Sequence, residues 1–134
     1  MYIDHVAIWT KDLERLKDFY SAYFGASVGP KYHNPAKNFE SYFLEFPSGS
    51  RIELMQRPEI PDTRNDPVEQ FTGYIHVAFA VEGEAAVDAL TETLRRAGYP
   101  ITGEPRRTGD GYYESHLLDP DGNRVELVAS RKQQ

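Results

Sequence analysis

The chain has 134 residues and a net charge of −6, and 40% of its residues are hydrophobic. This composition is typical of a globular domain and excludes a disordered chain, while the acidic balance argues against a nucleic-acid partner. Because there are no cysteines, disulfides, thiolate metal sites and cysteine nucleophiles are excluded, and any metal must be held by His and carboxylate side chains.

The first half of the chain is predicted to fold as a strand, a helix and three further strands. Residues 3–8 have the pattern of a strand, and apolar residues recur at helical spacing over residues 13–24, where Gly25 is a natural stop. The Pro-Ser-Gly sequence at residues 47–49 predicts a hairpin turn between the last two of these strands.

The second half repeats this order after a polar segment rich in proline, residues 57–73, which is the predicted linker. A strand at 74–79 precedes a helix predicted over residues 84–97, which Gly98 and Pro100 end. We therefore predict one domain of α+β class over residues 1–134, with module 1 at about 1–56 and module 2 at about 74–130. A lone module of this size would be marginally stable.

Sequence similarity between the halves points to duplication of one module. His5 and His76 stand in matching strands, and Glu53 and Glu126 follow matching turns that contain Pro and Gly. Side chains alternate across a strand, so all four are expected on the face opposite the apolar residues, where the helices do not pack.

A single His or Glu on a strand is usually a surface residue, but the same pair in both halves and on the same face indicates a shared metal ion. Two imidazoles and two carboxylates suit one divalent ion such as Zn, Ni, Co, Mn or Fe(II). The predicted ligands are His5, Glu53, His76 and Glu126.

These residues and their surroundings resemble the vicinal oxygen chelate superfamily, which contains glyoxalase I, extradiol dioxygenases and bleomycin-binding proteins. The resemblance lies in the opening His-Val-Ala strand, the helix after Asp12 and residues 73–79 and 119–127. It implies two tandem βαβββ modules that form an incomplete, cupped β-barrel with the helices on its outer face. The ligand order His, Glu, His, Glu is that of glyoxalase I.

The resemblance implies a metal-dependent, homodimeric lyase of glyoxalase I type, and the lack of a recognisable signal peptide predicts a cytoplasmic protein. It would act on the hemithioacetal of an α-keto aldehyde, or a related substrate with vicinal oxygens, by proton transfer through an enediolate. Glu126 is the expected general base, and Glu53 would exchange that role for the other stereoisomer. Open alternatives are a non-catalytic protein that sequesters a small molecule, a thiol transferase and a dioxygenase. No signal peptide or membrane span is recognisable in the sequence.

Two departures from the family pattern leave the thiol cosubstrate open. Trp9 and Arg57 stand where glutathione-using members usually have an arginine and an asparagine, so glutathione or another thiol is possible. The candidate residues for contacts to the small-molecule substrate are Trp9, Arg57, Arg107, Tyr113 and His116.

Overall fold

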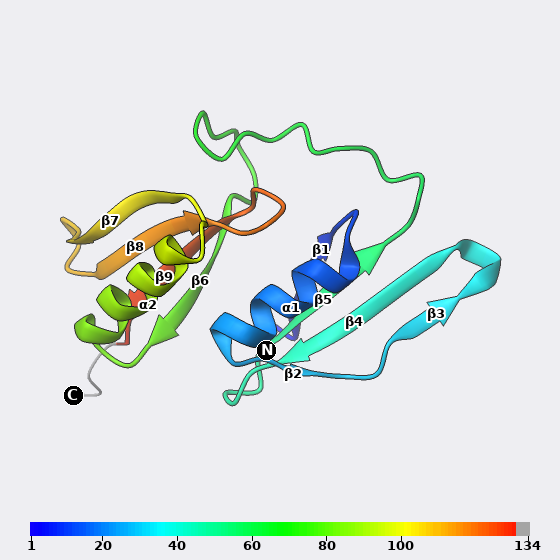
Figure 1. Ribbon diagram of the computed structural model, residues 1–134, viewed down its shortest axis with the longest axis horizontal. Coiled ribbons are helices and arrows are strands. Elements are labelled where there is room, and N and C mark those ends of the chain that lie inside the picture. Colours follow the sequence, from blue (N-terminus) through cyan, green and yellow to red (C-terminus); the bar gives the residue numbers. More distant parts are fainter. Residues whose placement is uncertain (131–134) are drawn as a thin grey trace. The chain divides into compact units, whose positions relative to one another are not determined.

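The computed structural model describes residues 1–130 and divides the chain into two compact units, Met1–Thr63 and Arg64–Gln134. Each unit packs one helix on one β-sheet, as Figure 1 shows, so the predicted α+β class with two tandem modules is confirmed. Residues 57–73, the predicted linker, contain no helix or strand. The predicted domain also includes residues 131–134, which lie outside the described part.

Unit 1 is a mixed sheet with the strand order β1-β5-β4-β2, in which β3 also pairs with β4. A short 3₁₀ turn, η1 (Pro35–Lys37), precedes β4. The elements are β1 (His5–Trp9), α1 (Leu13–Phe24), β2 (Ser27–Val28), β3 (Tyr32–Asn34), β4 (Phe39–Glu45) and β5 (Arg51–Gln56).

The prediction of three strands after the first helix is wrong for unit 1, because the first of them is divided into β2 and β3. Val28 lies opposite Leu44 and Tyr32 lies opposite Ser41, so residues 29–31 face only residues 42–43. One extra residue interrupts the ladder there, as in a β-bulge. Pro30, which has no N–H to donate, lies inside the interruption.

The helix α1 has the bounds that its sequence predicts. The Asp12 carboxylate accepts a hydrogen bond from the Arg15 amide at 3.1 Å, and Gly25 ends the helix with φ +69°, a left-handed conformation that suits glycine. Its apolar stripe packs on β4 and β5. The buried core of this unit includes Leu13, Leu16, Phe19, Tyr20, Leu44, Ile52 and Leu54.

Unit 2 has the predicted βαβββ order, with strands arranged as β6-β9-β8-β7. Its helix ends one residue before the predicted limit, and Gly98 follows with φ +94°. Inside, the Thr91 hydroxyl lies 2.7 Å from that of Ser115 and joins helix to sheet. The elements are β6 (His76–Val81), α2 (Glu84–Arg96), β7 (Ile101–Arg107), β8 (Tyr113–Leu118) and β9 (Arg124–Ala129).

The two units repeat one pairing scheme that places the predicted ligands. In each unit the first strand runs parallel to the last, and the ligand Glu pairs with the residue two after the ligand His: Ala7 with Glu53, and Ala78 with Glu126. Over residues 1–130 the strands form two separate sheets and no closed barrel. None of the helices described there has the length and apolar character needed to cross a membrane.

Candidate functional site

In unit 1, His5 and Glu53 face each other across neighbouring strands. His5 opens β1, and its Nε2 lies 3.8 Å from Oε1 of Glu53 on β5. The Glu53 side chain is 18% exposed, whereas its strand neighbours Ile52 and Leu54 are buried under α1. The alternation of the strand therefore puts the carboxylate on the face that the helix leaves open.

The other ring nitrogen of His5, Nδ1, lies within hydrogen-bond distance of Asp4. Nδ1 lies 2.8 Å from Oδ2 of Asp4, and the Arg51 guanidinium donates to the same oxygen at 2.5 Å. These two hydrogen bonds, that with His5 first, hold the pKa of the Asp4 carboxyl below its usual value. The Phe43 ring meets His5 edge-on at 5.4 Å and lies under the Arg51 guanidinium at 4.6 Å.

In unit 2 the equivalent pair is closer. His76 opens β6, and its Nε2 lies 3.2 Å from Oε2 of Glu126 on β9. The Glu126 side chain is 12% exposed, and this burial is the main reason why its pKa is raised; the nearby charge of His76 opposes the rise. Burial thus favours the protonated form of the Glu126 carboxyl group.

His116 lies on the same face as this second pair, because it is the cross-strand partner of Glu126. Its Nδ1 is 2.7 Å from the Thr102 hydroxyl, and burial, together with the nearby charges of Arg124 and Arg106, lowers its pKa. The structure therefore brings His116, a predicted substrate contact, next to Glu126. It occupies the position that Phe43 has beside Glu53 in unit 1.

A Gly103→Ala variant should push the His116 ring aside. A Cβ at residue 103 would lie 2.1 Å from Nε2 of His116, so the ring must turn away and lose its hydrogen bond to Thr102. We expect a loss of about 1 kcal/mol in the free energy of unfolding, measured in urea, with a shift of the His116 NMR signals. Gly109→Ala, where a Cβ would meet nothing within 4 Å, is the matched control; equal effects of the two changes would contradict this account.

Two further substrate candidates lie in unit 1. Trp9 ends β1, two strand positions past Ala7 on the His5 face, is 40% exposed and meets the Phe39 ring edge-on at 6.1 Å. Arg57 follows β5 and forms an ion pair with Glu59. Trp9 is therefore placed to contact a ligand on the His5 face, while the charge of Arg57 is already paired.

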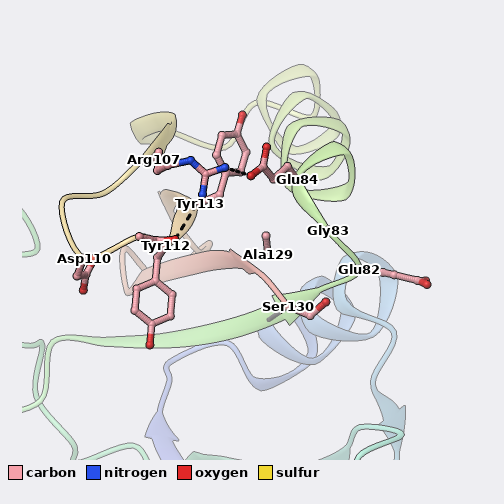
Figure 2. A pocket seen from close by; sticks show the side chains of 10 residues that line it. Glu82, Gly83, Glu84, Arg107, Asp110, Tyr112, Tyr113, Ala129 and Ser130 are labelled. Carbon is pink, nitrogen blue, oxygen red and sulfur yellow. Dashed lines mark hydrogen bonds and ion pairs between the residues drawn. The ribbon is translucent and has the colours of Figure 1, made fainter. Parts of the chain in front are cut away.

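Arg107 and Tyr113 lie elsewhere in unit 2, on the side that carries α2. The Tyr113 hydroxyl donates to Oδ1 of Asp88 at 2.6 Å, and Arg107 pairs with Glu84 at the start of α2. Both side chains line an open pocket beside the helix N-terminus (Figure 2), with a volume of about 1120 Å³. The structure thus separates these two candidates from His76 and Glu126 by the thickness of the sheet.

The spacing between the imidazole and carboxylate donor atoms can be compared with that of two ligands on one metal ion. Within residues 1–130 no three His, Asp or Glu side chains are arranged to hold a metal ion; each unit brings two of the predicted ligands together. Two ligands about 2.1 Å from a divalent ion, at octahedral or tetrahedral angles, lie about 3.0 to 3.5 Å apart. The 3.2 Å pair of His76 and Glu126 matches this spacing, and the 3.8 Å pair of His5 and Glu53 is slightly wider. The four-ligand centre stays a prediction.

Sequence reasoning missed Asp4 and the contact of Arg51. A signal was present, since Arg51 and Arg124 stand at matching places in the two halves, each two residues before a predicted ligand. That pattern marks a position near the site but does not reveal the partner. Arg51 bonds to Asp4, whereas Arg124 donates to the carbonyl of Pro67 at 3.3 Å.

Residues 2–127 match a protein-family model described as the Glyoxalase/Bleomycin resistance protein/Dioxygenase superfamily. Lactoylglutathione lyase GLX1 of Arabidopsis thaliana is 31% identical over 92% of the chain and 42% of its own length. A probable lactoylglutathione lyase of Vibrio cholerae is 26% identical over 96% of the chain and 90% of its own.

Solved structures also match most of the chain. A V278E mutant of glyoxalase I from Zea mays has a TM-score of 0.78 and 26% identity, over 96% of this chain and 44% of the maize chain. The chain thus spans less than half the length of the Arabidopsis and maize proteins.

Proposed function

Since the chain belongs to the glyoxalase/bleomycin resistance protein/dioxygenase superfamily, we propose that it is a metal-dependent lyase of glyoxalase I type. Its substrate would be the hemithioacetal of an α-keto aldehyde and a thiol, or a related compound with two vicinal oxygens. The relatives named lactoylglutathione lyase support this activity. We also propose a cytoplasmic homodimer.

The observation that carries the proposal is the duplicated His/Glu pair. In both units the His opens the first strand, the Glu lies on the last strand in the same register, and the imidazole Nε2 faces the carboxylate. A divalent ion held by His5, Glu53, His76 and Glu126 would act as a Lewis acid toward the two substrate oxygens.

Glu126 is the proposed general base. The resemblance to glyoxalase I implies this role, and the Glu126 side chain is only 12% exposed beside His76. The carboxylate would take the proton from one substrate carbon and return it to the neighbouring one. Glu53, on the other half, would do the same for the opposite stereoisomer.

The substrate portion beyond the reacting carbons would lie near Trp9. This ring shares the face of His5 and is partly exposed, so it suits an apolar or aromatic group. Arg57 is paired with Glu59, and a substrate carboxylate would have to displace that partner. The cosubstrate would therefore be a thiol that need not be glutathione.

The experiment is a screen of α-keto aldehydes with several thiols, on protein stripped with a chelator and reloaded with nickel, zinc, cobalt or manganese. We expect turnover that disappears with the metal and returns on reloading, at about one ion per chain by elemental analysis. No turnover under any combination, with tight binding of small molecules by the metal-free chain, would contradict the proposal and favour a sequestering protein.

A further inference from the structure

We propose that Asp4, held in place by Arg51, is a positioning residue that fixes the His5 ring with its proton on Nδ1 and leaves Nε2 free as a metal donor. The inference rests on the proposed function, because it concerns how one half of the metal site is prepared. Asp4 itself would not touch the metal or the substrate.

The first step is how Asp4 reaches the ring. Neighbouring residues within a strand point to opposite faces, so an Asp inside β1 could not turn back to His5. Asp4 lies just before β1 begins, and its backbone is free of that alternation. Oδ2 of its carboxylate therefore comes to 2.8 Å from Nδ1 of His5.

The second step is what holds the carboxylate. Arg51 is the direct cross-strand partner of His5, and its guanidinium donates to Oδ2 of Asp4 at 2.5 Å. The guanidinium also stacks over the Phe43 ring, whose edge contact with His5 completes the cluster. The carboxylate thus has a fixed place although its side chain is 56% exposed.

The third step assigns the proton. An ionised carboxylate only accepts hydrogen bonds, so Nδ1 of His5 must be the donor in its contact with Asp4. A neutral imidazole then carries its lone pair on Nε2. That nitrogen faces Glu53 at 3.8 Å, which is beyond hydrogen-bond reach and leaves the lone pair unused. A carboxylate behind a ligand His is a known means of fixing ring orientation and raising ligand basicity.

The two half-sites differ in this respect. In unit 2 the residue before His76 is Ile75, whose side chain cannot accept a hydrogen bond, and Arg124 in the place of Arg51 donates to the Pro67 carbonyl. Unit 1 would therefore be the half that is prepared for the metal before it arrives. His76 serves as an internal control for any measurement on His5.

The first test reads the tautomer of the metal-free, ¹⁵N-labelled full chain by long-range ¹⁵N–¹H NMR. At about pH 8 an ordinary imidazole is neutral, and we expect His5 to carry its proton on Nδ1. Asp4→Ala should move His5 toward the other tautomer and leave His76 unchanged, while Asp4→Asn, which keeps an acceptor oxygen, should restore part of the preference. A His5 tautomer that Asp4→Ala does not change would overturn the proposal.

The second test titrates zinc alone into the same metal-free proteins by calorimetry. Asp4→Ala should bind zinc about 10- to 100-fold more weakly than the unmodified chain. Asp62→Ala, which removes another exposed carboxylate of unit 1, paired with Lys11, should change neither affinity nor tautomer. Equal zinc affinity in Asp4→Ala contradicts the positioning role. Failure of the unmodified chain to bind zinc contradicts the proposed function, and the tautomer still decides whether Asp4 fixes the ring.

Discussion

A Glu126→Gln variant should turn over its substrate about 100- to 10,000-fold more slowly than the unmodified protein, the usual cost of removing a general base. The amide has almost the same shape and keeps one oxygen, but it cannot accept the substrate proton. The carboxylate that it replaces is 12% exposed and 3.2 Å from His76. Steady-state kcat, measured with the metal content of each preparation, is the readout.

Glu53→Gln is the matched variant in the other half of the site. Its partner His5 is further away at 3.8 Å, and its proposed role as a base concerns the opposite stereoisomer. We expect a smaller loss of kcat on substrate of the preferred configuration than Glu126→Gln shows. Full activity of Glu126→Gln at full metal content would contradict its role as the base.

The placement of the two His/Glu pairs could be predicted from the sequence because two simple rules determine it. Strand alternation assigns each side chain to a face, and the repeated Pro-x-Gly turn fixes the distance from turn to Glu in both halves. The structure confirms the resulting faces for Glu53 and Glu126, whose neighbours Ile52, Leu54, Val125 and Leu127 are buried. The helices were equally accessible to prediction, since Asp12 and Gly25 mark both ends of α1.

The same rule, applied further along the chain, would have separated the substrate candidates. Tyr113 has the parity of Ser115, which bonds to Thr91 on α2, and so lies on the helix side of the sheet. His116 has the opposite parity and lies beside Glu126. The sequence contained this distinction, but it becomes usable only when the start of β8 is known to the residue.

Other features depend on interactions that leave no periodic signal. The division between β2 and β3 comes from a one-residue mismatch with β4, and a shift of pairing register is invisible in either strand alone. The contact of Asp4 with His5 arises because the chain has not yet entered β1. Both are local departures from regular structure, which the periodicity of a sequence does not reveal.

A Leu127→Ala variant should lose about 2 to 5 kcal/mol of the free energy of unfolding, among the largest effects for a single core substitution. Leu127 is fully buried on β9, on the face that packs against α2. Truncation removes apolar contacts and leaves a cavity that the helix and the neighbouring strands can close only in part. Urea unfolding followed by circular dichroism gives the change as a lower midpoint at an unaltered slope.

The control for this variant is Val68→Ala in the same unit. Val68 is 71% exposed, so its truncation should change the stability by no more than about 0.5 kcal/mol. Leu54→Ala, at the matching position of unit 1 and equally buried, should lose as much as Leu127→Ala, because the two units repeat one arrangement of helix and sheet. A loss below about 1 kcal/mol in both Leu variants would mean that the helices do not pack on the faces opposite the ligand pairs. The faces that carry His5 and His76 would then not be the sides of the sheets that the helices leave open.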